Sequence, residues 1–178
     1  MFSFFRKKPA GIKTDDNVYI TEEARLAALL QMWQTAPETA FIFWFDQSLE
    51  KAAEYFNRYQ AATVVLLTAR EAARRHGSGP VVFAEHYPIS AKEENLWQEL
   101  NLPHITVYSC LEEPLFQRFG GERIISLIKK LGMEETEAIS HPMISQSIRN
   151  AQQKIAKQVS FEQTASSQED WFKKNLPA

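Results

Sequence analysis

Six side chains of this sequence that could take part in catalysis or ligand binding each come shortly after a short apolar run. They are Asp46, Thr68, Glu85, His86, Cys110 and Glu112. If the runs are parallel strands, their carboxyl ends meet at one edge of a sheet, where α/β proteins bind ligands. Two kinds of site fit these residues. One is a metal ion held by Asp46, Glu85 and His86. The other is a Cys110 nucleophile with His86 as its base.

Ordinary structural roles account for the same residues, and we favour them. Asp46 and Thr68 stand where a helix begins, so each is expected to cap a helix. Glu85 and His86 are then solvated loop residues. Cys110 is more typical of a small buried apolar side chain than of a nucleophile.

The elements that would position these residues alternate along the chain. Four apolar runs predict buried strands, at Phe41–Phe45, Thr63–Leu67, Pro80–Ala84 and His104–Ser109. Helical patterns separate them, which favours parallel βαβ units. The sequence therefore predicts a three-layer α/β domain with a parallel sheet of about four strands, followed by a helical carboxyl-terminal extension.

Helix signals complete this outline. Ser90-Ala-Lys-Glu93 matches a capping box at the start of one helix. After Ser109 the pattern is helical throughout, with an apolar face between Ile124 and Leu131 that Gly132 ends. Pro142 suits the first turn of a last, longer helix, whose apolar stripe then follows. The stripe consists of Met143, Ile144, Ile148, Ala151, Ile155 and Val159.

We expect four segments. Residues 1–17 are predicted to be a flexible tail, 18–133 the α/β domain, 134–159 a carboxyl-terminal helix, and 160–178 a second flexible tail. The first tail could make weak peripheral membrane contact or be simply disordered. That contact would use Phe2, Phe4, Phe5, Arg6, Lys7 and Lys8. In the second tail, Trp171 and Phe172 could dock into a partner or onto the protein's own surface.

The composition is that of an ordinary globular protein of 178 residues, with 44% hydrophobic residues and a net charge of −2. Nothing in that charge favours nucleic acid, whose binding needs clustered Lys and Arg. Cys110 is the single cysteine, so no intrachain disulfide can form and a reducing compartment is favoured. No apolar run approaches the roughly 20 residues that span a bilayer. We expect a cytoplasmic protein.

An ordered series of short motifs in the last third of the chain resembles the SecA preprotein translocase ATPase family. It comprises Leu111-Glu112-Glu113, Phe119-Gly120, Arg123, Leu131-Gly132-Met133, His141-Pro142, Ile148, Asn150-Ala-Gln152 and Lys154. In that family the order marks the end of the second motor lobe and the start of the scaffold helix. The resemblance implies a fold like the second lobe of a helicase, of the P-loop NTPase type, in a degenerate and truncated form.

The departures from the family argue against catalysis. No Gly-x-x-x-x-Gly-Lys-Ser/Thr loop occurs, and Gly77-Ser-Gly-Pro80 lacks the lysine that would neutralise a phosphate. Where the family carries an arginine-rich finger segment, Phe83 to Glu93 contains no arginine. Loss of an arginine finger alone costs about 10³–10⁵ in rate. We therefore expect a pseudo-ATPase, with neither nucleotide nor metal as cofactor.

Three functions fit these observations. The favoured one is a non-catalytic SecA-like domain that acts as a protein-interaction or regulatory module, with an unidentified protein partner and a link to protein export. The alternative is a small enzyme or ligand-binding protein that uses the polar pocket at the strand ends. The third is self-assembly, with the apolar stripe of the 142–159 helix facing a second chain.

Overall fold

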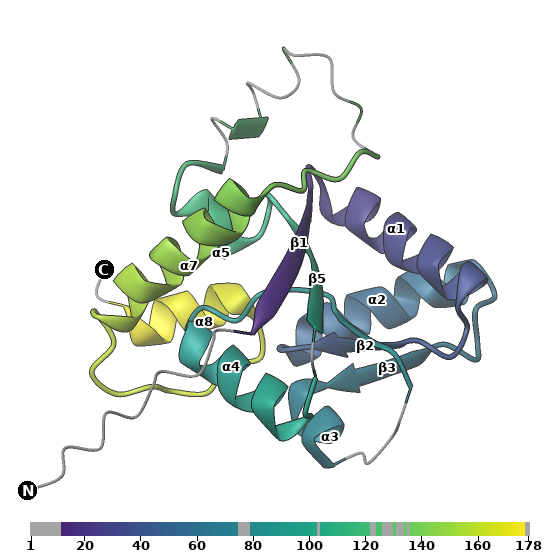
Figure 1. Cartoon of the computed structure of the whole chain (residues 1–178), viewed down its shortest axis with the longest axis horizontal. Coiled ribbons are helices and arrows are strands. Elements are labelled where there is room, and N and C mark those ends of the chain that lie inside the picture. Colours follow the sequence, from purple (N-terminus) through teal and green to yellow (C-terminus); the bar gives the residue numbers. More distant parts are fainter. Residues whose placement is uncertain are drawn as a thin grey trace, which may run out of the picture.

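A five-stranded, all-parallel sheet forms the centre of the protein (Figure 1). The computed structural model describes residues 12–74, 79–102, 104–121, 124–125, 130, 134 and 136–176. The strands lie in the order β1-β5-β4-β2-β3. They are β1 (Lys13–Tyr19), β2 (Ala40–Phe43), β3 (Val65–Thr68), β4 (Val81–Phe83) and β5 (His104–Cys110). The prediction of an α/β fold around a parallel sheet is confirmed.

Helices cover both faces of the sheet. They are α1 (Glu22–Thr35), α2 (Asp46–Arg58), α3 (Ala69–Arg74), α4 (Ser90–Glu99), α5 (Pro114–Gln117), α7 (Pro142–Ala156) and α8 (Gln168–Asn175). Figure 1 shows α5, α7 and α8 grouped beside β1, on the side away from β3. The apolar face that was predicted between Ile124 and Leu131 falls largely outside the described residues.

The three layers follow from the alternation of side chains along the central strand β2. Phe41 and Phe43 point to one face, where they pack with Leu29 of α1 and Phe56 of α2. Ile42 points to the other face, into a cluster with side chains of β4, β5, α3 and α4. That cluster includes Ala72, Phe83, Leu96, Trp97, Ile105 and Val107. Because both faces are covered, the strand is apolar at every position.

The first strand corrects the prediction of a flexible tail over residues 1–17. β1 pairs with β5 along its whole length, from Lys13 opposite His104 to Tyr19 opposite Cys110. The apolar pattern does not reveal it, because its inner positions include a carboxylate, Asp16, which is only 3% exposed. Residues 1–11, including those proposed to touch a membrane, lie outside the described residues.

Helix α7 packs onto its own domain, which corrects the self-assembly hypothesis. Ile148, Ala151 and Ile155 of its stripe are buried in one cluster with Val18 and Leu111. This part of the stripe therefore covers the β1 side of the sheet and is not available to a second chain. Met143, at the start of the helix, is the exception and is 72% exposed.

Helix α8 corrects the prediction of a flexible tail over residues 160–178. Trp171 is fully buried and Phe172 is 3% exposed, both in the cluster that also buries α7. The Trp171 indole N–H donates hydrogen bonds to the Tyr87 hydroxyl at 3.0 Å and to Glu162 Oε1 at 3.1 Å. Of the two possibilities for these aromatic residues, docking onto the protein's own surface is the one realised.

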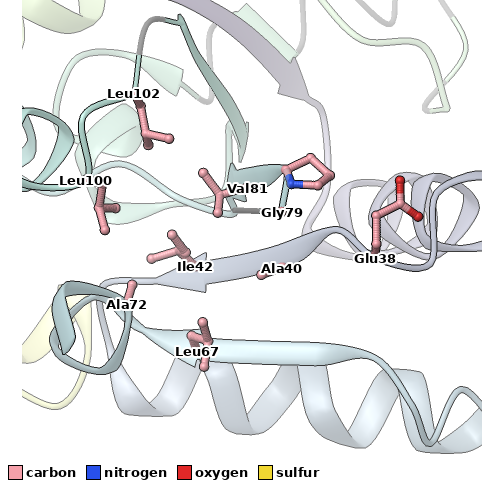
Figure 2. Close-up of a pocket in the computed structure, with 10 residues that line it drawn as sticks. Glu38, Ala40, Ile42, Leu67, Ala72, Gly79, Val81, Leu100 and Leu102 are labelled. Carbon is pink, nitrogen blue, oxygen red and sulfur yellow. The ribbon is translucent and has the colours of Figure 1, made fainter. Parts of the chain in front are cut away.

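A small cavity of about 100 Å³ lies at the amino-terminal end of the central strands (Figure 2). Ala40, Val81 and Leu102 are among its apolar walls, and Glu38 is its acidic residue. This lining offers little chemistry. None of the helices in the described part of the chain is both long and apolar enough to cross a bilayer.

The burial of Trp171 makes α8 part of the folded core. We expect Trp171→Ala to lower the free energy of unfolding by about 3–5 kcal/mol, because it removes a large buried side chain and leaves a cavity. Urea denaturation followed by circular dichroism measures this. Phe161→Ala is the matched control, since Phe161 is 81% exposed, and should change stability by at most about 0.5 kcal/mol. Equal, small effects of both variants would contradict the placement of α8.

Candidate functional site

The carboxyl ends of β2 and β4 flank the point in the sheet where ligands are expected. From β2 the chain continues to β3 on one side, and from β4 it continues to β5 on the other. Such a switch in direction opens a crevice between two adjacent strands. Residues 44–46 follow β2 and residues 84–86 follow β4, so the backbone of three sequence-predicted residues, Asp46, Glu85 and His86, lies beside this crevice.

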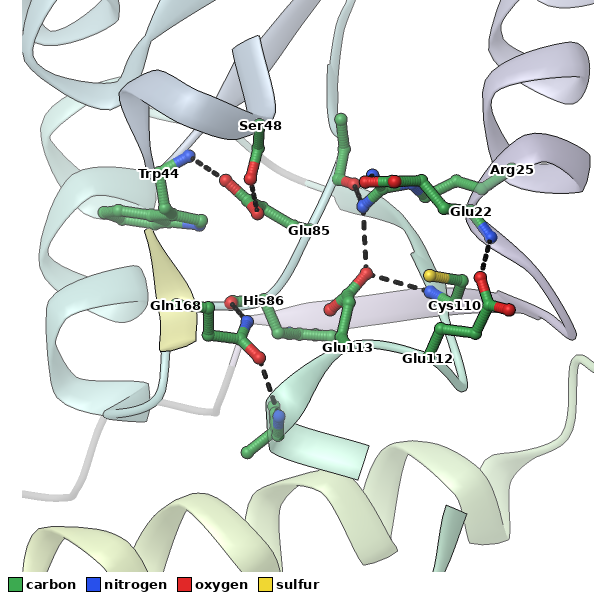
Figure 3. Close-up of polar contacts among 12 residues, drawn as sticks. Glu22, Arg25, Trp44, Ser48, Glu85, His86, Cys110, Glu112, Glu113 and Gln168 are labelled. Carbon is green, nitrogen blue, oxygen red and sulfur yellow. Dashed lines mark hydrogen bonds and ion pairs between the residues drawn. The ribbon is translucent and has the colours of Figure 1, made fainter. Parts of the chain in front are cut away.

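The side chain of Glu85 reaches from the end of β4 to the segment before α2 (Figure 3). Its Oε1 accepts hydrogen bonds from the backbone N–H groups of Trp44, at 2.8 Å, and Phe45, at 3.0 Å. Its Oε2 accepts a hydrogen bond from the Ser48 hydroxyl at 2.7 Å. Burial raises the pKa of Glu85, although nearby Arg25 and these hydrogen bonds act in the opposite direction. The two amides immediately before helix α2 are thus bonded to a carboxylate of the chain itself.

A buried arginine on α1 lies beside Glu85. Arg25 is 1% exposed, and its Nη1 donates hydrogen bonds to the Ala84 carbonyl at 2.6 Å and to Glu113 Oε1 at 2.9 Å. The same Glu113 oxygen accepts a hydrogen bond from the Cys110 amide at 2.9 Å. The guanidinium therefore joins α1 to the segments that follow β4 and β5 (Figure 3).

Burial raises the pKa of Glu113 to about 7, although Arg25 opposes the shift. Glu112, the neighbouring residue, is exposed, and its Oε2 accepts a hydrogen bond from the Glu22 amide at 2.8 Å, at the start of α1. Glutamates therefore bind the first amide of α1 and the two amides immediately before α2. Negative charge is stabilised at such positions.

These residues surround a polar cavity of about 320 Å³, which we call the strand-end cavity. Helix α8 closes one side of it through Gln168, whose side chain accepts a hydrogen bond from the Leu115 amide and donates one to the His86 carbonyl. The lining residues are Glu22, Arg25, Gln47, Ser48, Lys51, Glu85, Cys110, Glu112, Glu113, Pro114, Ser167, Gln168 and Glu169.

Of the six residues that the sequence places at the strand ends, three line this cavity, and Asp46, Thr68 and His86 do not. Glu85, Cys110 and Glu112 line it. Asp46 is exposed at the first turn of α2 and is not part of the lining. The imidazole of His86 points into a different cluster, described below.

The residues are not arranged for either of the two predicted sites, the metal site or the Cys110 nucleophile. Glu85 and His86 bind different partners, so the metal trio with Asp46 is not assembled. Within the described ranges no group of three His, Cys, Asp or Glu residues could hold a metal ion. The Cys110 thiol is buried, and burial raises its pKa, which suppresses the thiolate.

The structural roles that we favoured are realised only in part. Thr68 does cap α3, because its hydroxyl accepts a hydrogen bond from the Glu71 amide at 3.2 Å. Asp46 makes no capping bond, since no side chain caps α2. Glu85 and His86 are buried rather than solvated, at 2% and 3% exposure.

The sequence reasoning missed Arg25 and Gln168, and it saw Glu113 only as part of a motif. The signal for Arg25 was present. It lies four residues before Leu29, and positions four apart share one face of a helix. A charged residue on an apolar stripe calls for a buried partner. Gln168 gave no comparable signal, because its surroundings are uniformly polar.

A second buried cluster surrounds His86. Its Nε2 lies 2.9 Å from Asp16 Oδ1 on β1, and its Nδ1 lies 3.0 Å from Glu93 Oε1 on α4. Glu93 Oε2 accepts a hydrogen bond from Gln152 of α7 at 2.8 Å. Glu93 is therefore not the partner of Ser90 in a capping box, and α4 begins without a side-chain cap. The cluster joins the sheet, α4 and α7.

Burial by itself would lower the pKa of His86, but Glu93 and Asp16 outweigh it and raise the pKa well above its ordinary value. His86 is therefore a cation between two carboxylates at neutral pH. A group whose pKa is raised on folding stabilises the fold below its unfolded pKa, and that stabilisation is lost as pH rises through the folded pKa.

We expect His86→Gln to lower the free energy of unfolding at pH 7 by about 3–5 kcal/mol, because two buried carboxylates lose their cation. The difference from the wild type should shrink as pH rises through the raised pKa of His86. Denaturant titrations at a series of pH values measure both effects. His104→Gln is the control, since His104 pairs with Asp15 at the exposed edge of the sheet and should change stability by no more than about 1 kcal/mol. A difference that stays constant with pH would show that His86 is not charged.

Comparison with known proteins relates part of this α/β chain to a protein translocase subunit. No family model matches the sequence. Over 48 residues the chain is 48% identical to protein translocase subunit SecA 1 of Alkaliphilus metalliredigens. It is 50% identical over 48 residues to protein translocase subunit SecA of Acidithiobacillus ferrooxidans.

The matched segment is 27% of this chain and 5% of each of these relatives. A segment of the chain is therefore related to SecA, and the match spans about one twentieth of the length of the curated relatives.

Proposed function

We propose that this chain is a protein-interaction module linked to protein export, and that it does not hydrolyse ATP by itself. The observation that carries the proposal is the segment related to SecA, a protein named as a translocase subunit. The structure supplies a second argument, from the charge of the site where a nucleotide would be expected.

Phosphates bind where free helix amides and cations meet them. At the switch point of this sheet the amides of Trp44 and Phe45 are already bonded to Glu85. Glu112 holds the corresponding position at the start of α1. A nucleotide phosphate would therefore have to displace carboxylates and would meet the remaining negative charge of the cavity. This arrangement supports a role without nucleotide chemistry.

The alternative of a small enzyme required Asp46, Glu85 and His86 to share one pocket. Because His86 is committed to Asp16 and Glu93, and the Cys110 thiol is held neutral by burial, no arrangement of these residues favours that alternative.

We expect the purified chain to bind Mg·ATP with a Kd weaker than about 1 mM and to show no ATP turnover, because the strand-end cavity repels phosphate. Isothermal titration calorimetry and a phosphate-release assay measure this. Micromolar binding together with turnover that Glu85→Gln abolishes would overturn the non-catalytic part of the proposal.

A direct contact with the export machinery is the second expectation. The full chain, labelled at its amino terminus, should bind purified SecA from the same cell, and fluorescence anisotropy should give a saturable curve. Trp171→Ala serves as a destabilised comparison and should bind less, in proportion to its unfolded fraction. Absence of binding to SecA, and to membranes that carry the assembled translocase, would remove the link to export.

A further inference from the structure

The strand-end cavity carries an excess of negative charge. Five of its lining residues are glutamates and two are basic. Both basic residues already have partners within the cavity, since Arg25 pairs with Glu113 at 2.9 Å and Lys51 pairs with Glu22 at 3.1 Å. The glutamates are Glu22, Glu85, Glu112, Glu113 and Glu169. Glu85 and Glu113 are buried, whereas Glu112 and Glu169 are exposed, so the acidic lining runs from the floor to the mouth.

One carboxylate of this lining has an oxygen without a partner. Glu113 is 7% exposed, and its Oε2 is buried with no hydrogen bond (Figure 3). A buried carboxylate oxygen ordinarily accepts at least one hydrogen bond. The second unpartnered atom in the lining is Arg25 Nε, which is a donor and would be satisfied by a water molecule or a carbonyl oxygen.

We propose that the strand-end cavity binds a lysine or arginine side chain of a protein partner, with its cationic head at Glu113. This inference rests on the proposed function, because it names the chemistry by which an interaction module would recognise its partner.

A cationic side chain fits the cavity better than the other ligand classes. An anion would meet five glutamates, and the amides of Trp44, Phe45 and Glu22 beside the cavity are already bonded to glutamates. A metal ion needs several converging ligands, and among the residues that the structure describes no group of three is so arranged. An ammonium or guanidinium group accepts looser geometry, and guanidinium can bind a carboxylate through two parallel hydrogen bonds.

The binding should depend on pH. Arg25, Glu85 and His86 are the charged groups that act on Glu113 from α1 and from the segment after β4. Glu22 on α1, Lys51 on α2, Glu112 after β5 and Glu169 on α8 complete the charged lining. Because the pKa of Glu113 is raised to about 7, a cation should bind more tightly at pH 8 than at pH 6, where Glu113 is largely protonated.

The test is an NMR titration of the full chain with N-acetyl-arginine methylamide and N-acetyl-lysine methylamide. N-acetyl-citrulline methylamide is the neutral probe of matched shape. We expect the cationic probes to shift resonances of the cavity residues, and to bind at least about tenfold more tightly than the citrulline probe. Glu113→Gln should abolish this preference. Equal binding of charged and neutral probes, or no binding of either, would overturn the proposal.

A second variant keeps the test sound if Glu113→Gln unfolds the protein. Glu112→Gln combined with Glu169→Gln removes two exposed charges at the mouth and should weaken the cationic probes about threefold to tenfold. The matched control, Glu50→Gln with Glu99→Gln, removes two exposed charges that do not line the cavity and should leave binding unchanged. Equal effects of the two double variants would indicate a general charge effect and would contradict the site.

Two further outcomes separate this inference from the proposed function. Spermidine binding more tightly than either amino-acid probe would replace the protein partner with a free polyamine. If SecA binds the wild type and the Glu112→Gln, Glu169→Gln variant equally, the proposed function stands and the cavity is not the contact. If the probes bind as expected and SecA does not, the cavity stands and the link to export fails.

Discussion

The burial of Arg25 against Glu113 is the interaction on which the carboxyl end of the sheet depends. The guanidinium contacts the carbonyl of Ala84 after β4 and the carboxylate of Glu113 after β5, so one side chain of α1 ties together two strand ends. Removing one partner of such a buried pair leaves an uncompensated charge, which costs about 3–5 kcal/mol. The polar character of the strand-end cavity follows from this requirement, because the charges there stabilise one another.

α/β proteins usually bind a ligand at this end of the sheet. Here several of the amides that could bind a ligand are hydrogen-bonded to carboxylates of the chain itself. Glu85 accepts hydrogen bonds from the two amides just before α2, and Glu112 accepts one from the first amide of α1. The chain thus places its own carboxylates where the amides of helix amino termini would otherwise attract an external anion. This arrangement supports the proposal that the chain contacts a protein partner and does not carry out phosphate chemistry.

Apolar runs were sufficient to predict the covered strands. Residues 41–43 and 82–84 are buried on both faces of the sheet, so their composition alone distinguishes them. β1 was not predicted, because the groups that stabilise its pairing lie far away in the sequence. Asp16 on that strand is matched by His86, seventy residues later. Helix α8 was missed for a similar reason, since its two aromatic residues stand in a polar segment and only the folded domain provides their pocket.

The sequence predicted where the candidate site lies, but it did not predict which side chains share it. Reactive residues do gather at the strand ends, yet Glu85 and His86 point to different clusters, as adjacent residues of an extended chain do. Because their side chains point in opposite directions, Glu85 and His86 do not bind one metal ion together. The groups that set the charge of the cavity, Arg25 and Glu113, belong to a helix and to a turn that no strand pattern marks. Their pairing is a long-range contact across 88 residues.

The titration of Glu113 tests this account most directly. Carbon-13 NMR of glutamate carboxyl groups in the folded chain, with Glu113→Gln for assignment, gives the midpoint for this one side chain. Burial beside Arg25 predicts a midpoint of about 7. A midpoint at or below the ordinary value of 4.5 would mean that burial does not outweigh the pairing with Arg25, and it would contradict the raised pKa from which the pH dependence of cation binding follows.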